Sequence, residues 1–245
     1  MNPETAQVTR QGNRDENQDR VRIVTSKSRV LLTVADGMGG HMGGGLAADT
    51  AVEALVQAFQ DDDDIPEPAE FLRRSIVHAH HAVVALGADL DPDLRPRTTI
   101  TACLVSASMV RWAHVGDSRV YFIRDRKVLE RTRDHSAVEI LAQQGLLEDI
   151  DLAFHPLRNF VDQCLGGESE LPTIDISDPR PLLAGDVVLL CSDGFWSPLD
   201  DTQLAQALGD RLTLQAGLES LALEAELRST PMSDNVSAAA LRWRD

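Results

Sequence analysis

The chain has few cysteines, and their spacing excludes two common classes of site. Only three of its 245 residues are cysteines, namely Cys103, Cys164 and Cys191. No two of them have the Cys-x-x-Cys spacing of a zinc or redox motif, and three cysteines form no even disulfide framework. We therefore expect reduced and mostly buried thiols.

The sequence also lacks an excess of basic residues and a long apolar segment. It has 23 Lys and Arg against 39 Asp and Glu, a formal net charge of −16. This acidity argues against nucleic-acid binding, which needs a positive surface, and against docking on an anionic membrane. No apolar run approaches the roughly 20 residues that span a bilayer, and the N-terminus lacks the basic and apolar regions of a signal peptide. We expect a cytoplasmic protein.

The hydrophobic pattern predicts an α+β protein with layers of helices and antiparallel strands, formed by one domain over residues 1–245. Tight connections at 106–108 and 125–126 join short neighbouring strands, as in antiparallel hairpins. The predicted strands are 20–25, 29–35, 98–105, 110–115, 120–124, 127–131, 173–176, 187–191 and 236–243. The predicted helices are 46–60, 69–86, 137–144, 202–208 and 212–228.

Three local features of the two long helices have a structural interpretation. The first helix is expected to bury a face that includes Leu46, Ala51, Leu55 and Phe59. On the second helix, neither His78 nor His80 is spaced i,i+4 from His81. We therefore expect these three histidines to be surface side chains and not a zinc-binding pair. The aspartates at 61–64 lack the alternation of an EF-hand loop, which favours a solvated turn.

Five aspartates share a common context, because each lies where an apolar strand meets a loop. They are Asp19, Asp36, Asp117, Asp193 and Asp234. Any one alone is typical of a turn. A hairpin turn does not explain Asp36, however, because a glycine-rich loop and a helix follow it. Clusters of carboxylates suit Mg²⁺ or Mn²⁺, and a pair of such ions roughly 3.5–4 Å apart activates a water. The sequence leaves open whether the five meet in space.

Seven segments resemble motifs of the metal-dependent protein phosphatases of type 2C, the PPM family, in its compact bacterial form. They follow the family's order and extend from about Arg10 to Ala240. The segments are Gly12–Asp19, Val34–His41, Arg97–Thr99, His114–Arg119, Thr132–Ser136, Leu190–Trp196 and Ser233–Ser237. Each segment is weak evidence alone, whereas seven in order are highly specific.

The resemblance implies a four-layer αββα sandwich, with two central, mainly antiparallel sheets flanked by helices and a metal centre at one end. It implies that Asp36 bridges two Mn²⁺ or Mg²⁺ ions and that the Gly37 carbonyl binds one of them. Further ligands carried over are Asp193 and Asp234 at the first ion and Asp19 around the second. Asp117 is expected, with Asp193, to hold a third and weaker ion.

Two further residues acquire catalytic roles from the resemblance. Arg14 is expected to bind the substrate phosphate, because a planar guanidinium grips two phosphate oxygens. Eukaryotic members carry a histidine directly after Asp-Gly, where this chain has Met38, so His41 is the nearest candidate for the general acid. The chain also has Gln18 where many members carry glutamate, and residues 159–166 are less basic than is usual in the family.

The implied activity is hydrolysis of phosphoserine and phosphothreonine in proteins, by a hydroxide that bridges the two metal ions. The expected partners are phosphoproteins, with a bacterial Hanks-type Ser/Thr kinase or its targets foremost, and a monomer is expected. Residues 134–170 would form a flap beside the site. Two alternatives stay open, a catalytically silent regulatory or binding domain and a phosphatase of small molecules.

Overall fold

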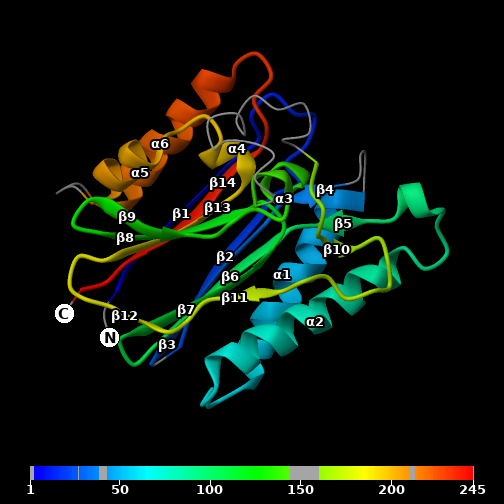
Figure 1. Cartoon of the computed structure of the whole chain (residues 1–245), viewed down its shortest axis with the longest axis horizontal. Coiled ribbons are helices and arrows are strands. Elements are labelled where there is room, and N and C mark those ends of the chain that lie inside the picture. The colour runs from blue at the N-terminus through cyan, green and yellow to red at the C-terminus, as the bar shows by residue number, and fades with distance from the viewer. Residues whose placement is uncertain (1–2, 27, 39–42, 144–159, 210–212, 245) are drawn as a thin grey trace.

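The computed structural model describes residues 3–26, 28–38, 43–143, 160–209 and 213–244. Two antiparallel sheets lie face to face in the middle of the molecule (Figure 1). The first sheet has the strand order β1 (Glu4–Arg10), β14 (Val236–Arg242), β13 (Val187–Cys191), β8 (Arg119–Arg124) and β9 (Lys127–Arg131). The second has the order β11 (Asp175–Ile176), β7 (Met109–Val115), β6 (Ile100–Ser106), β3 (Arg29–Ala35) and β2 (Arg20–Thr25).

Short strands extend this arrangement at the margins. β12 (Arg180–Pro181) also pairs with β7. A small separate sheet joins β10 (Leu165–Gly166), β5 (Arg97–Thr98) and β4 (Gly37–Met38). The turns β6–β7 and β8–β9 place two residues each at positive φ, as the predicted two-residue hairpins require: Ala107, Ser108, Asp125 and Arg126.

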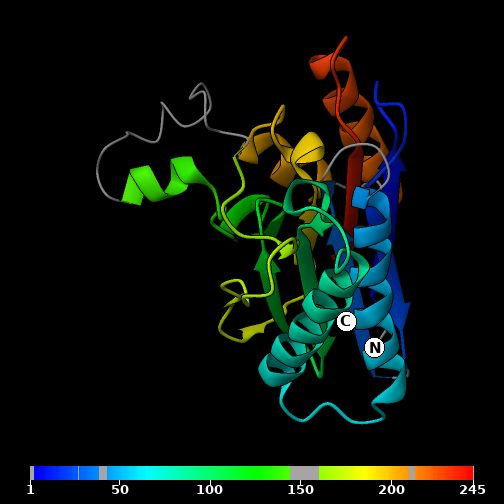
Figure 2. The ribbon, with the colours of Figure 1, turned by 90° about the vertical axis from the view of Figure 1, so that its right-hand side faces the viewer.

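Helices cover the outer face of each sheet. α1 (Gly43–Asp61) and α2 (Pro68–Leu86) pack on the second sheet, whereas α5 (Asp201–Leu208) and α6 (Leu214–Ser229) pack on the first. The short α4 (Asp193–Trp196) directly follows β13, and η1 (Pro92–Leu94) precedes β5. α3 (Ala137–Gln143) projects away from the sandwich (Figure 2). No helix among the described residues is both long and apolar enough to cross a bilayer.

Alternation along the central strands explains the four layers. On β3, Leu31 points into the core beneath α1 and α2, whereas Leu32 and Val34 point into the core between the sheets. On β13, Leu189 faces the helices of the other side and Leu190 faces the central core. Since successive side chains of a strand point to opposite faces, a strand buried on both faces must be apolar throughout. The expected αββα sandwich is confirmed.

The pattern predicted most elements, with several corrections. The strand β1 was missed, because its seven residues include only one buried side chain, Ala6. The two-residue strands β4, β10 and β12 are too short for periodicity to detect. Leu46 is 52% exposed, contrary to expectation, because the helix turns the stripe of small residues at 47, 48 and 51 toward the sheet instead.

The predictions for histidines and cysteines were mostly right. His78 and His81 are exposed, but His80 is buried and accepts a hydrogen bond at Nδ1 from the Gly166 amide at 3.3 Å, since α2 packs against β10. The three cysteines are free thiols, two of them buried. The turn at 61–64 is solvent-facing, as expected.

The central core sets a quantitative test of the layered fold. Leu190→Ala should lower the free energy of unfolding by about 2–5 kcal/mol, because the fully buried side chain would leave a cavity between two sheets that cannot collapse onto it. Leu227→Ala, at a position that is 64% exposed on α6, serves as the control and should change stability by less than about 0.5 kcal/mol. Urea denaturation of the two variants measures both values, and equal effects would contradict the layer assignment.

Candidate metal centre

The five aspartates all lie at one end of the two facing sheets. Strand register explains this position. Asp19 precedes β2 and Asp36 follows β3, and these strands are antiparallel with Arg20 opposite Ala35, so both aspartates flank the same strand ends. Asp193 follows β13 and Asp234 precedes β14, whose antiparallel register pairs Cys191 with Ala238.

Strand register also places Asp117 at the same end of the first sheet. It precedes β8, and β8 runs antiparallel to β13 with Arg119 opposite Cys191. The loops that carry the five carboxylates therefore converge, although they lie up to 215 residues apart in sequence. The sequence alone left this convergence open.

A hydrogen bond between the two sheets holds Asp19. The Ser192 hydroxyl, at the end of β13, donates to Asp19 Oδ2 at 2.8 Å. Ser192 in turn accepts at Oγ from the Ser237 amide on β14. The other carboxylate oxygen, Asp19 Oδ1, is buried without a hydrogen-bond partner. Asp19 is thus fixed in orientation with one oxygen left free for a ligand.

The backbone around Asp36 is fixed by Thr98 and Thr99. The Asp36 amide donates to Thr99 Oγ1 at 3.0 Å, and the Asp36 carbonyl accepts from the Thr99 amide and from the Thr98 hydroxyl, each at 2.9 Å. The next residue must be glycine, because a Cβ on Gly37 would lie 2.2 Å from the carbonyl oxygen of Gly44 at the start of α1. This close approach leaves room for a backbone carbonyl beside the carboxylates and none for a side chain.

Asp193 and Asp234 are brought together by close packing of their loops. A Cβ on Gly194 would lie 2.1 Å from the Asn235 carbonyl oxygen, so the start of α4 touches the loop before β14. The Asn235 side chain then ties this loop to the loop of Asp19, since its Oδ1 accepts from the Gln18 amide at 2.9 Å. Asp193 Oδ1 is buried and without a partner.

Burial and mutual repulsion disfavour ionisation of these groups. Burial, followed by the charges of Asp19, Asp193, Asp117 and Asp234, raises the pKa of Asp36 well above its usual range. Burial raises the pKa of Asp19 from 3.8 to about 7 and that of Asp193 to about 6. A protein pays such a desolvation cost at sites where a counter-charge is supplied.

The residues present fit hard divalent cations. The donors are carboxylate oxygens, two of which are buried and lack a partner, and the Gly37 carbonyl lies in the same loop as Asp36. Mg²⁺ and Mn²⁺ prefer oxygen ligands, and a cation would relieve the repulsion that raises the pKa values. The group that can hold such ions is Asp19, Asp36, Gly37, Asp193 and Asp234.

Arg14 is the cation beside this cluster. Its Nη2 donates to Asp234 Oδ2 at 2.5 Å, and this hydrogen bond is the main cause of the raised pKa of Arg14. The charges of Asp193 and Asp36 contribute as well. The Arg14 side chain is 59% exposed, so the guanidinium lies at the boundary between the carboxylates and solvent.

Asp117 has its own supporting network, which the sequence reasoning missed. The Trp196 indole donates to the Asp117 carbonyl at 3.0 Å, and the Arg119 guanidinium lies over the Trp196 ring at 3.2 Å from its centre. Arg119 also pairs with both carboxylate oxygens of Asp134, at 2.7 and 2.8 Å. After burial, the charge of Asp193 is the main cause of the raised pKa of Asp117, so these two carboxylates are neighbours.

Other supporting residues were also missed, although a signal for them was present. Ser192, Ser118 and Thr99 are buried hydroxyl residues beside or opposite the aspartates, and Thr99 Oγ1 lies 2.8 Å from Ser118 Oγ. Small hydroxyl residues adjacent to strand-end aspartates, as in Ser192-Asp193 and Asp117-Ser118, are the pattern that indicates them.

Two of the predictions cannot be compared with the structure. His41 lies outside the described residues, as does much of the expected flap, residues 144–159.

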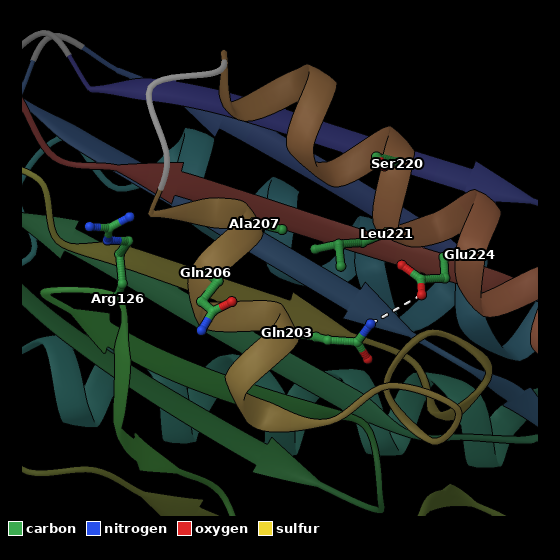
Figure 3. Close-up of a pocket in the computed structure, with 7 residues that line it drawn as sticks. All are labelled: Arg126, Gln203, Gln206, Ala207, Ser220, Leu221 and Glu224. Atoms are coloured by element: carbon green, nitrogen blue, oxygen red, sulfur yellow. Dashed lines mark hydrogen bonds between the residues drawn. The ribbon is translucent and has the colours of Figure 1, made fainter.

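A polar pocket of about 650 Å³ between α5, α6 and the β8–β9 turn contains none of the predicted site residues. Gln203 and Glu224 are hydrogen-bonded across it (Figure 3).

The pKa shifts predict an unusual dependence of stability on pH in chelator. Below pH 3.8 the aspartates are protonated in the folded and the unfolded chain alike. As the pH rises toward 7, the unfolded chain releases protons that Asp19 and Asp193 retain when folded, so the free energy of unfolding decreases.

Thermal unfolding in EDTA at pH 5 and pH 8 tests this expectation. The increase in Tm on adding excess Mn²⁺ should be larger at pH 8, where the ion does not compete with protons. Asp19→Asn should weaken the pH dependence of unfolding in EDTA and the pH dependence of the Mn²⁺-induced increase in Tm, because it removes one of the titrating groups. A Mn²⁺-induced increase that is equal at the two pH values would contradict the assignment of these carboxylates.

Comparisons with known proteins agree with the site. The family model described as protein phosphatase 2C matches residues 7–230. Serine/threonine protein phosphatase PstP of Mycobacterium tuberculosis is 36% identical over 182 residues, which cover 73% of this chain but 34% of PstP. The chain thus spans about a third of the length of that relative. Serine/threonine phosphatase stp of Listeria monocytogenes is 32% identical over 208 residues, covering 82% of this chain and 81% of stp.

A solved structure gives the same result for the fold. The catalytic domain of PstP, in complex with two manganese ions, superposes with a TM-score of 0.82 at 29% identity and covers 99% of both chains. The sequence motifs, the four-layer fold and the convergence of five aspartates at one end of it all agree with the match over residues 7–230. The chain belongs to the protein phosphatase 2C family.

Proposed function

We propose that this chain is a metal-dependent phosphatase of phosphoserine and phosphothreonine in proteins. The observation that carries the proposal is the set of buried carboxylates at the end of the two sheets, with unpartnered oxygens on Asp19 and Asp193. Relatives named serine/threonine phosphatases support the substrate class. A phosphomonoester is hydrolysed very slowly in water, so the site must supply a nucleophile and neutralise phosphate charge.

Two Mn²⁺ or Mg²⁺ ions are the proposed cofactors, as in the PstP structure. When bound, such a pair supplies an ionised water as nucleophile at neutral pH and neutralises charge on the phosphate. Asp36 is the residue proposed to be shared between the ions, and the charges of the four other aspartates around it support this role. The remaining proposed ligands are Asp19, Asp193, Asp234 and the Gly37 carbonyl, and Asp117 with Asp193 would hold a third ion.

Arg14 is the proposed phosphate-binding residue. Its guanidinium has five N–H donors, and the hydrogen bond to Asp234 occupies Nη2. The side chain is 59% exposed at the edge of the carboxylate cluster, so its other donors are proposed to meet an incoming phosphate. A guanidinium grips two phosphate oxygens at once and so orients the ester for in-line attack.

Residues around the carboxylates hold the loops of the site in position. The Ser192–Asp19 hydrogen bond couples the two sheets, and Trp196 and Arg119 fix the loop of Asp117. The general acid stays a prediction: His41 is the candidate, and a water at the centre is the alternative. We extend the proposal to one catalytic domain over 1–245, since β1 pairs along its whole length with β14 and so joins the two ends of the chain.

The expected setting follows from the activity. Phosphoproteins are the proposed substrates, with a bacterial Ser/Thr kinase or its targets foremost, and the protein is proposed to act as a cytoplasmic monomer. A silent regulatory domain is the alternative. The completeness of the aspartate set favours an enzyme, because burial of Asp19, Asp36, Asp117 and Asp193 disfavours their charged forms, a cost that bound metal ions would offset.

Hydrolysis assays distinguish the enzyme from the silent domain. The protein should cleave p-nitrophenyl phosphate and phosphothreonine peptides with Mn²⁺, lose this activity in EDTA, and recover it better with Mn²⁺ than with Ca²⁺. Asp36→Asn should remove nearly all turnover and retain the circular dichroism of the fold. Full activity of metal-free protein in chelator would contradict the proposal, and absence of activity under every metal would favour the silent domain.

A separate test addresses Arg14. Arg14→Ala should lower kcat/KM by about 10–100-fold, as expected for loss of a charge-assisted contact to phosphate. The concentration of Mn²⁺ that gives half of the maximal activity should not rise, because the variant removes a positive charge beside the cluster. Arg73→Ala, an exposed arginine of α2, is the matched control and should retain kcat/KM. If Arg14→Ala behaves like Arg73→Ala, Arg14 does not bind phosphate.

A further inference from the structure

A second group of metal-ligating side chains lies on the other sheet. His114 is on β7, and Asp175 lies opposite it on the neighbouring strand β11 (Figure 1). His135 belongs to the segment after β9, and its ring centre is 4.6 Å from that of His114. One ligand atom from each of the three residues lies within 4.8 Å of the other two. None of the three is a residue of the carboxylate cluster.

The histidine rings are held in orientations that suit metal binding. The Arg133 carbonyl lies 2.8 Å from His114 Nε2 and can only accept a hydrogen bond, so Nε2 carries the proton and Nδ1 does not. Metal-binding histidines commonly donate their second nitrogen to a carbonyl in this way. His135 Nε2 donates to Asp175 Oδ2 at 3.1 Å, since the carboxylate can only accept, and an ion bound between the two would replace this proton. Two ligands of one tetrahedral zinc ion, at bond lengths of 2.0–2.1 Å, lie about 3.3 Å apart.

The electrostatic environment favours a neutral His114 ring, and the neutral ring is the form that binds metals. Burial, followed by the proximity of His135, lowers the pKa of His114 to about 4. His114 therefore presents an unprotonated nitrogen at every physiological pH. Asp175 contributes the negative charge and is 56% exposed, so an ion has a route from solvent.

The donor set selects a different metal from that of the carboxylate cluster. Two imidazole nitrogens with one carboxylate oxygen are typical ligands of zinc, whereas Mg²⁺ and Mn²⁺ favour oxygen. We propose that His114, His135 and Asp175 form a binding site for Zn²⁺ or a similar borderline divalent ion, distinct from the proposed phosphatase centre. Three protein ligands leave one tetrahedral position for water.

The site adjoins the loop that carries Asp117. The His135 amide donates to the Gly116 carbonyl at 2.9 Å, and the Gly116 amide donates to His135 Nδ1 at 3.4 Å. A Cβ on Gly116 would lie 2.6 Å from Thr99 Cγ2, so this loop has little freedom to move. The ligand nitrogens are thus mounted on rigid backbone, which lowers the entropic cost of binding an ion.

Metal titration of the full chain tests the proposal. With the carboxylate centre saturated by excess Mg²⁺, the protein should bind one Zn²⁺ by calorimetry. One Co²⁺ should give the visible absorption of a tetrahedral site with nitrogen ligands. Asp175→Asn and His135→Gln should each weaken Zn²⁺ binding by at least about 10-fold. Asp175 is exposed, so its variant should keep the fold, as circular dichroism would verify.

Two controls make the result specific. His81→Gln, at an exposed histidine of α2, should leave Zn²⁺ affinity unchanged. Asp36→Asn, which disables the proposed phosphatase centre, should retain the Co²⁺ spectrum. Equal Zn²⁺ affinity of wild type, Asp175→Asn and His135→Gln would overturn the proposal, as would loss of the Co²⁺ spectrum in Asp36→Asn. Neither outcome bears on Mn²⁺-dependent hydrolysis, which is measured separately.

Discussion

Repulsion among buried carboxylates is the constraint on which the functional end of this protein depends. Burial raises the pKa of Asp19, Asp36 and Asp193, and the charges of Asp19 and Asp193 raise the pKa of Asp36 further. An apolar replacement would make the fold more stable, since burying charge without a counter-charge costs several kcal/mol per ion. The arrangement is reasonable only with cations between the carboxylates, and the fold must hold the carboxylates together against their repulsion until cations bind.

The sandwich supplies that rigidity through contacts between its two sheets. Ser192 on the first sheet donates to Asp19 beside the second, and Asn235 accepts from the Gln18 amide. The core between the sheets, which includes Leu32 and Leu190, fixes the distance between the strand ends. Because a packed interior resists deformation, the carboxylates cannot relax away from one another without unpacking this core.

Two kinds of polar support surround the centre and act differently. Hydroxyls orient the carboxylate of Asp19 and the backbone of Asp36 without neutralising either carboxylate, so their charge remains available to cations. Arg119, in contrast, is fully occupied by Asp134 and by the Trp196 ring, so it holds a loop rather than a substrate. Arg14 is the cation of the group that stays half exposed, which suits recognition of an anion from solvent.

The sequence by itself determined the layers and the chemistry of this protein. Alternating apolar strands such as 29–35 and 187–191, and helices with one apolar face, predicted the α+β fold, because hydrophobic periodicity is local information. The position of the aspartates directly beside apolar strands is local information too, and it predicted an oxygen-rich metal site. β1 escaped prediction because an edge strand buries too few side chains to show a pattern.

Only the tertiary structure decided which residues meet. Packing of the two sheets brings Asp19 to Ser192, which are 173 residues apart, and the pairing of β11 with β7 places Asp175 opposite His114. No local pattern encodes such pairs, because register and sheet order are set by packing between distant segments. For the same reason no sequence pattern joined His114, His135 and Asp175, because these residues lie on three separate segments.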